Sequence, residues 1–332
     1  MNEEWAKFLA SRTENDQQGA DLNCALNDLS HLGLIRVSGE DAEAYLQGQL
    51  TNDIREVTRS HSNLAGWCNA KGRMLANFRC FRREDDYYLQ TPTENIPSVV
   101  QRLGMYILRS KVTLSDVSDE LIRVGLTGNC SEALLEPFFD EIPEQPNDIQ
   151  QQDQLTLIRL PGKKPRYEIV GPIQQLQEIW QTAEGQAQSA SADFWALQEI
   201  QAGIPTIYQA TKEAFVPQMT NMQLIDGVSF TKGCYTGQEV VARMQYLGKL
   251  KRRMYLAHVE TNTTPQPGDE LFASLSTSGQ GTGKVVEAQA NGDGYDLLAV
   301  IEIASAEEDQ VLLGEQGSPL NIVNLPYPFA ES

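Results

Sequence analysis

Residues 232–239 read Lys-Gly-Cys-Tyr-Thr-Gly-Gln-Glu, a run that combines a cation, a thiol and two glycines within eight positions. Thr236 and Glu239 have the spacing of a capping box, so we predict that a helix begins at Gly237. Gly248 follows at a distance that suits the end of this helix. The run therefore predicts a tight loop that leads directly into a helix.

Cys234 lies just before this expected helix and two residues after Lys232. A helix N-terminus carries partial positive charge and a lysine carries full positive charge, and both stabilise a thiolate. We therefore interpret Cys234 as a reactive or redox-active thiol whose ionised form Lys232 favours, and we name these two residues as candidate catalytic groups. The alternative is a small apolar side chain in a tight turn, and the residues alone leave both interpretations open.

A basic segment starts at the same lysine. Residues 232–253 contain six cations and one acid, Glu239, which gives a net charge of +5 inside a chain of net charge −19. Arg243 is our candidate within this segment for holding the anionic tail of a ligand. Docking of a partner and a solvated basic edge are equally consistent with the pattern.

The overall composition restricts the classes of function. The length of 332 residues fits two or three domains. The excess of 45 acidic over 26 basic residues argues against a broad electrostatic surface for nucleic acid, so we expect no direct nucleic-acid binding. We find no apolar run of the roughly 18 residues that a membrane span needs, and no secretory signal. We expect a soluble cytoplasmic protein without membrane contact.

Five cysteines and three histidines are scattered along the chain. The cysteines are odd in number and form no C-x-x-C pair, which argues against a zinc ribbon and a thioredoxin-like centre. We therefore predict free thiols, as expected in a reducing cytoplasm, and no metal site.

Periodicity and turn residues indicate the secondary structure. The sequence predicts strands over residues 32–37, 74–82 and 86–90, and helices over residues 96–108, 172–182 and 192–201. Residues 251–332 alternate short apolar runs with glycine-rich turns, which is typical of a small β-barrel or sandwich. Residues 279–284 have some likeness to a phosphate loop, but Ser278 and Val285 occupy its required glycine and hydroxyl positions, so we predict a turn.

The run at residues 232–239 resembles a motif of the YgfZ family, the folate-binding branch of proteins similar to the glycine-cleavage T-protein, an aminomethyltransferase. Three other stretches agree with the family in order: Tyr45–Asp53, Asn69–Arg73 and Trp195–Pro205. The resemblance spans about residues 25–330, and the eight-residue run is its most specific part.

The resemblance implies an α+β fold, in which antiparallel sheets with flanking helices form a three-domain ring. The first domain would comprise residues 22–57 and 118–205. The second, interleaved with it, would comprise residues 58–117 and 206–250 and carry the Lys-Gly-Cys-Tyr loop. Residues 251–332 would form a C-terminal β-barrel.

The resemblance also implies a ligand and a cellular role. The ligand is tetrahydrofolate or a one-carbon derivative, and the role is maintenance of iron–sulfur enzymes, including those that thiomethylate tRNA. Trp195 matches the aromatic folate contact of the family, and Leu32 matches a second contact position without an aromatic ring. Gln201 stands where the T-protein has a carboxylate, and it keeps one acceptor and two donors.

One departure bears on catalysis. The aminomethyltransferases have a folate-adjacent Asp after the strand that matches Tyr87–Gln90, and residues 91–97 contain none. Without this partner for the reacting folate nitrogen we do not assign aminomethyltransferase activity. The leading hypothesis is a folate-dependent accessory protein. A folate-dependent one-carbon transferase or demethylase and a non-catalytic partner-docking scaffold are the alternatives, so we leave open whether the chain is an enzyme.

Overall fold

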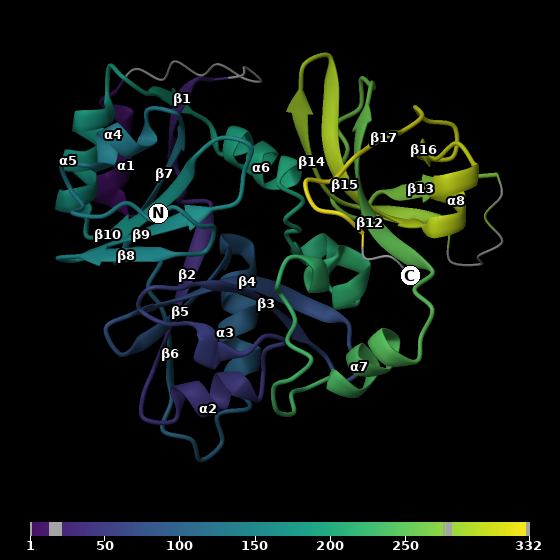
Figure 1. The fold of residues 1–332 in the computed structure, drawn as a ribbon, viewed down its shortest axis with the longest axis horizontal. Coiled ribbons are helices and arrows are strands. Elements are labelled where there is room, and N and C mark those ends of the chain that lie inside the picture. The colour runs from purple at the N-terminus through teal and green to yellow at the C-terminus, as the bar shows by residue number, and fades with distance from the viewer. Residues whose placement is uncertain (1, 13–21, 275, 277–280, 330–332) are drawn as a thin grey trace. The chain divides into compact units, whose positions relative to one another are not determined.

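The computed structural model describes residues 2–12, 22–274, 276 and 281–329 (Figure 1). The chain divides into two compact units, and each draws on three segments of the sequence. Unit 1 comprises Met1–Leu46, Ile54–Asn63 and Phe78–Trp195, and unit 2 comprises Gln47–Asp53, Leu64–Asn77 and Ala196–Ser332. The division into three domains with the boundaries given above stays a prediction.

Unit 1 contains a six-stranded sheet that is antiparallel except at one edge. In sheet order its strands are β11 (Gln188–Ala190), β1 (Cys24–Asp28), β7 (Ile122–Gly128), β10 (Arg166–Gly171), β9 (Leu155–Leu160) and β8 (Ile149–Gln152). Only β11 and β1 pair in parallel among these strands. The helices α1 (Glu3–Ala10), α4 (Ser131–Leu135) and α5 (Ile173–Ala183) lie beside this sheet (Figure 1). Trp5 of α1 and Trp180 of α5 join its apolar side chains in one buried cluster.

A five-stranded sheet follows the order β3 (Asn63–Cys68), β4 (Met74–Arg83), β5 (Asp86–Pro92), β2 (Leu32–Ser38) and β6 (Thr113–Asp116). The helices α2 (Ala42–Gln47) and α3 (Ile96–Gly104) belong to the same part of the chain, and α3 contacts β2 and β6. The three strands and the helix predicted in this region are confirmed, with α3 ending four residues before the predicted boundary.

A second six-stranded sheet in unit 2 is antiparallel throughout. Its order is β16 (Leu312–Leu313), β13 (Glu270–Phe272), β14 (Gly283–Asn291), β15 (Gly294–Glu302), β12 (Arg252–Val259) and β17 (Asn321–Val323). The predicted strand-rich character of residues 251–332 is confirmed, whereas closure into a barrel stays a prediction. Part of the glycine-rich stretch 279–284 lies outside the described residues, and Gly283 opens a strand rather than a helix.

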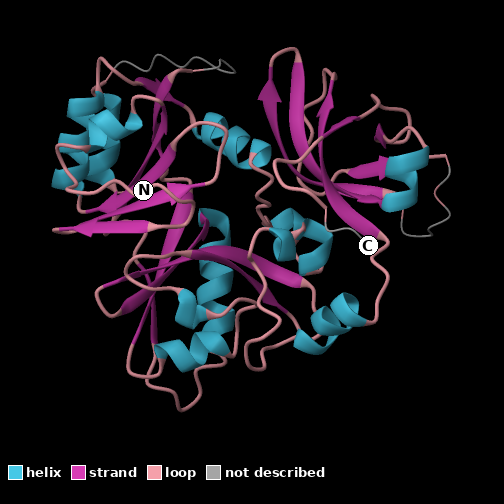
Figure 2. Cartoon of the chain, in the orientation of Figure 1, coloured by secondary structure: helices cyan, strands magenta, loops and turns pink. Residues whose placement is uncertain are grey.

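The remaining helices are α6 (Ala192–Gln201), α7 (Gln238–Tyr246), α8 (Ile303–Glu308) and five short 3-10 helices, η1 (Ile54–Glu56), η2 (Thr93–Asn95), η3 (Gln209–Thr211), η4 (Pro217–Thr220) and η5 (Met222–Leu224). The prediction of helices near residues 172–182 and 192–201 is confirmed by α5 and α6. Helices and antiparallel strands occur in both units, so the predicted α+β class is confirmed (Figure 2).

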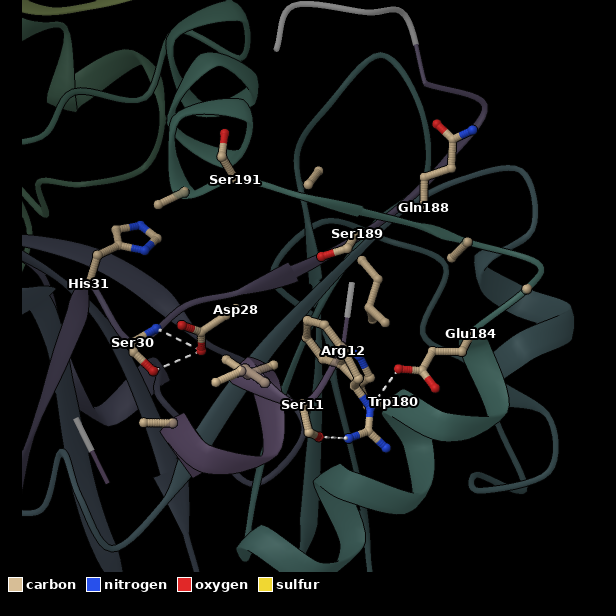
Figure 3. A pocket seen from close by; sticks show the side chains of 18 of the residues that line it. Ser11, Arg12, Asp28, Ser30, His31, Trp180, Glu184, Gln188, Ser189 and Ser191 are labelled. Carbon is tan, nitrogen blue, oxygen red and sulfur yellow. Dashed lines mark hydrogen bonds and ion pairs between the residues drawn. The ribbon is translucent and has the colours of Figure 1, made fainter. Parts of the chain in front are cut away.

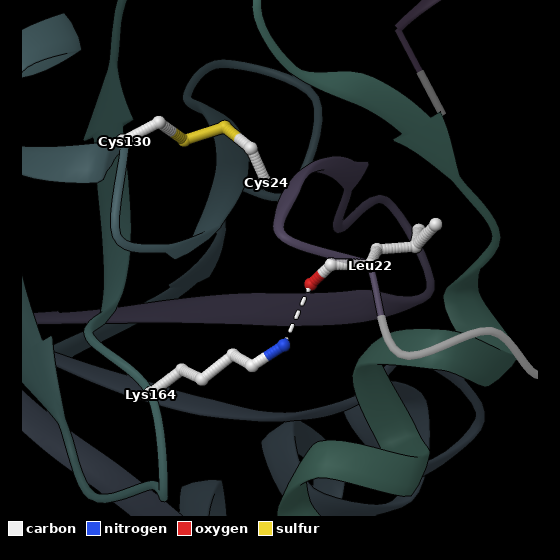
Figure 4. The surroundings of a disulfide bond; sticks show 4 residues. All are labelled: Leu22, Cys24, Cys130 and Lys164. Carbon is white, nitrogen blue, oxygen red and sulfur yellow. Dashed lines mark hydrogen bonds between the residues drawn. A yellow bond between two sulfur atoms is a disulfide. The ribbon is translucent and has the colours of Figure 1, made fainter.

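The prediction of five free thiols is wrong. Cys24 and Cys130 form a disulfide, with their Cα atoms 5.8 Å apart and a separation of 106 positions in sequence (Figure 4). The antiparallel register places Cys24 opposite Gly128, two residues before Cys130, and sequence separation concealed this proximity. Beside the disulfide, Lys164 Nζ donates to Leu22 O at 3.0 Å. The inference of a reducing compartment rested on free thiols and no longer has that support.

Glu287 has a buried carboxyl group at an irregular point of the six-stranded sheet in unit 2. The register between β14 and β15 shifts between Val285 and Glu287, which marks a β-bulge. The side chain is only 2% exposed, and Tyr208 Oη donates to Glu287 Oε1 at 2.6 Å. Burial raises the pKa of Glu287 to about 7, against the lowering effect of the Tyr208 hydrogen bond.

The raised pKa of Glu287 predicts how the free energy of unfolding depends on pH. The folded chain binds this proton more tightly than the unfolded chain, so the stabilising contribution is lost as pH rises through the folded pKa of about 7. The free energy of unfolding of Glu287→Gln, taken relative to that of the native chain, should therefore be about 2 kcal/mol higher at pH 8 than at pH 5.5. Urea unfolding at both pH values measures this gain. Glu260→Gln, at an exposed position of the same unit, is the control, and an equal gain there would contradict the assignment.

Candidate functional site

Cys234 lies in the loop that precedes α7, and its side chain is exposed. All five cysteines belong to the described residues, and the other two free thiols, Cys68 and Cys80, are buried. Burial raises the pKa of Cys68 to about 12, so this thiol stays protonated near neutral pH. Cys234 is therefore the thiol that a solvent-borne reagent or partner can reach.

The loop enters α7 through a glycine rather than through the predicted capping box. Gly237 is the N-cap residue with φ of 85°, and no side chain caps the helix. Thr236 instead donates its backbone N–H to Gly48 O at 3.4 Å. The helix start at Gly237 is confirmed and the capping box is wrong, because this left-handed conformation suits glycine and displaces Thr236 from the cap. At the other end, Gly248 N–H bonds Arg243 O at 2.9 Å, which confirms the predicted helix end.

Gly237 packs directly against the turn at residues 69–73. A Cβ atom on Gly237 would overlap Asn69 O, and one on Gly72 would lie 2.9 Å from Val240 Cβ. The turn itself is closed by Asn69 Oδ1, which accepts the N–H groups of Lys71 at 2.9 Å and Arg73 at 3.1 Å. Two of the motif stretches therefore interlock at positions where only glycine fits without a shift.

The buried side chain of Lys232 anchors the loop. Its side chain is 6% exposed, and Nζ donates to Leu50 O at 2.7 Å and Asn52 O at 2.8 Å. The same nitrogen lies 5.2 Å from the ring centroid of Tyr235. This anchoring contact was not indicated by the sequence, and the predicted effect of Lys232 on the Cys234 thiolate stays a prediction.

The segment that receives Lys232 is itself tied to its surroundings. Asn52 Nδ2 donates to Leu64 O at 2.8 Å and to Asp226 O at 2.6 Å. Thr51 Oγ1 donates to Gly227 O at 2.8 Å. Three stretches that the sequence singled out separately are Tyr45–Asp53, Asn69–Arg73 and residues 232–239. The last two and the Gln47–Asp53 part of the first thus meet in unit 2 around one loop.

The candidate folate contacts Trp195 and Leu32 lie in unit 1. Trp195 is 2% exposed, and Leu32 packs against the same apolar cluster. The indole is covered by Gly125, which has no room for a Cβ beside the ring, and by the Arg166 guanidinium, 4.5 Å from the ring centroid. Trp195 therefore has a core packing role in addition to any role in binding.

The candidate contacts Gln201 and Arg243 lie in unit 2, so the proposed ligand contacts are distributed over both units. Gln201 Nε2 donates to Asp296 Oδ2 at 2.9 Å, and Asp296 Oδ1 lies 2.8 Å from His258 Nδ1. The Arg243 side chain is exposed and makes no hydrogen bond or ion pair with a described residue. Arg243 is thus available to an anionic group.

A cavity of about 1240 Å³ in unit 1 was not indicated by the sequence. Most of its wall comes from α1 and the two residues after it, from β1 and the turn that follows it, and from the end of α5 and residues 184–192, none of which carries a motif (Figure 3). On this wall Arg12 Nε and Glu184 Oε1 form an ion pair at 2.6 Å, and the Ser30 hydroxyl donates to Asp28 Oδ1 at 2.7 Å. These polar groups satisfy one another, so we assign no catalytic role to them.

In the part of the chain that the structure describes, the His, Cys, Asp and Glu side chains form no group of three or more that could hold a metal ion. The helices of the same part are all too short or too polar to cross a membrane.

The fold is similar to that of an aminomethyltransferase T. The solved structure of glycine cleavage system aminomethyltransferase T from Bartonella henselae superposes with a TM-score of 0.71, at 16% sequence identity, and covers 92% of this chain and 86% of that one. This likeness concerns the fold alone. A family profile described as the GCVT N-terminal domain matches residues 6–153.

The sequence relationship is more specific. The tRNA-modifying protein YgfZ of Klebsiella pneumoniae (strain 342) is 32% identical over 314 residues, which cover 94% of this chain and 96% of that protein. The chain therefore belongs to the YgfZ family.

The contacts of Lys232 predict a loss of stability on its removal. Lys232→Met should lower the free energy of unfolding by about 1–3 kcal/mol, because the buried Leu50 and Asn52 carbonyls lose a charged donor. Urea unfolding measures the change, and Lys251→Met at an exposed position is the matched control. Unchanged stability of the Lys232 variant would show that the ammonium does not anchor the loop.

Proposed function

We propose that this chain is a folate-binding accessory protein that uses tetrahydrofolate or a one-carbon derivative in the maintenance of iron–sulfur enzymes. The observation that carries the proposal is the relationship to YgfZ of Klebsiella pneumoniae over 94% of this chain. That relative is named as a tRNA-modifying protein. For this chain we propose an indirect effect on tRNA, through client enzymes such as those that thiomethylate tRNA in the cytoplasm.

Cys234 is the residue that we propose for the chemistry. A cysteine that serves as a small apolar side chain is expected to be buried, as Cys68 and Cys80 are. Cys234 is exposed, and its loop is fixed on one side by Lys232 and on the other by Gly237. An exposed thiol on a fixed loop supports a role toward a partner, with Lys232 as the group that favours the thiolate.

The candidate folate contacts are chemically suited to that ligand. Leu32 and Trp195 offer apolar contact to a flat ring. Gln201 uses its amide nitrogen toward Asp296, which leaves its Oε1 as an acceptor for a ring N–H. Arg243 offers an exposed guanidinium to the carboxylates of a folate tail. When bound, the folate would supply one-carbon or redox chemistry.

Tetrahydrofolate binding tests the first half of the proposal. We expect calorimetry on the full chain to show saturable binding, and Trp195→Phe to weaken it about threefold or more through loss of indole contact. Trp180→Phe, at a buried tryptophan of a separate unit 1 cluster, the one that also contains Trp5, is the matched control. Absence of saturable heat with the native chain would refute folate binding. Equal weakening by both variants would assign the effect to stability.

A partner-docking role is the second candidate, and the end of α7 favours it. Tyr246 is 67% exposed and Leu247 is 85% exposed, and Arg243 and Lys249 flank them in sequence. Large apolar side chains beside cations are typical of a docking surface for an acidic protein partner. This surface is compatible with Cys234 chemistry in the loop before α7 and also with a scaffold that has no chemistry.

Complementation of cells that lack the family member separates these roles, with thiomethylated tRNA as the readout. We expect Cys234→Ser to abolish rescue while tetrahydrofolate binding in vitro is retained. Lys249→Glu tests docking, and the scaffold is favoured if this variant fails to rescue while Cys234→Ser rescues fully. Turnover of a methylamine donor by the purified chain would instead support the one-carbon transferase alternative.

A further inference from the structure

A small cavity in unit 2 collects positive charge. Its volume is about 230 Å³, and its wall includes the cations Arg73, Arg252 and Lys284 and the apolar side chains of Phe215, Met219 and Val300. No Asp or Glu is among the described residues that line it. In a chain of net charge −19, three cations around one cavity favour the binding of an anion there.

The sheet register brings two of these cations together. β12 and β14 both pair with β15, and Arg252 lies opposite Glu302 while Lys284 lies opposite Val300. The two side chains therefore flank the same end of β15 from its two neighbouring strands. Arg252 Nη2 donates to Gly281 O at 2.6 Å, which holds its guanidinium beside the start of β14.

Arg73 belongs to a segment that is distant in sequence from the two strands, and its guanidinium is held through only one of its nitrogens. Its Nη1 donates to Ala214 O at 2.6 Å and to Glu213 O at 3.2 Å. Neither its Nε nor its Nη2 bonds a described residue. A guanidinium held at one nitrogen, with its other N–H groups uncommitted, is suited to accept an oxyanion.

Two acids that neighbour these cations, Glu270 and Glu302, do not line the cavity. Lys284 Nζ lies 3.2 Å from Glu270 Oε1, and the Glu270 side chain is largely exposed. Glu302, opposite Arg252, accepts Ser276 Oγ at 2.9 Å. An exposed ion pair of this kind contributes little, so the Lys284 ammonium can exchange Glu270 for a ligand at small cost.

We propose that this cavity binds a small anionic group, a phosphate or a carboxylate, on a short apolar stem. The volume lies below the roughly 300–1,000 Å³ of pockets for whole drug-sized ligands, so it suits such a group rather than a complete cofactor. The three cations bind the oxygens, and Phe215, Met219 and Val300 contact the stem. The site is independent of the proposed folate and Cys234 roles. It also differs from a phosphate loop, because Lys284 lies on a strand.

Calorimetry on the full chain tests the site, with inorganic phosphate and glutarate as probes and ionic strength held constant with chloride. We expect at least one probe to bind saturably, and the stronger one identifies the source as phosphate or carboxylate. Arg252→Gln and Lys284→Gln should each weaken that binding about tenfold, the loss of one charged hydrogen bond. Melting curves establish that the variants are folded.

Lys251→Gln is the matched control, because Lys251 is exposed next to Arg252 and does not line the cavity. Affinity that survives this change and falls with the other two supports the site. Absence of binding by both probes overturns the proposal. Equal weakening by Lys251→Gln also overturns it, since the effect would then be general attraction to a basic surface. None of these outcomes depends on folate binding or on Cys234.

Discussion

The buried ammonium of Lys232 fixes the part of unit 2 on which the other contacts of the site depend. Removing an ammonium group from water is unfavourable unless its donors find acceptors, so the carbonyls of Leu50 and Asn52 must stay where the lysine reaches them. Asn52 transmits this requirement, because its side chain also bonds Leu64 O and Asp226 O. One charged group thereby sets the relative positions of three chain segments that are distant in sequence.

The second constraint is steric. Gly237 and Gly72 allow the loop before α7 and the turn at residues 69–73 to approach more closely than any side chain would permit. Lys232 and Gly237 therefore fix the loop at both ends, and Cys234 lies between them with its side chain exposed. Because the loop is already fixed, it loses little conformational entropy when its thiol contacts a partner. This is the physical sense in which the eight-residue run is a functional unit.

The sequence predicted what depends on local pattern and missed what depends on tertiary contacts. Strands β2, β4 and β5 and the start and end of α7 follow from apolar periodicity and glycine positions. The capping box is not formed because Gly237, in a left-handed conformation, occupies the N-cap position that the prediction gave to Thr236. The Cys24–Cys130 disulfide follows from a strand register that joins residues 106 apart, so no local pattern contains it.

Net charge and local charge lead to different conclusions about ligands. At physiological ionic strength the screening length is about 8 Å, so the overall charge of −19 acts weakly inside a cavity that has its own cations. A polyanion such as tRNA must instead contact an extended surface, for which a chain with a large acidic excess is poorly suited. A single phosphate or carboxylate group needs only Arg73, Arg252 and Lys284. The same charge distribution that disfavours direct tRNA binding is thus compatible with selective binding of small anions.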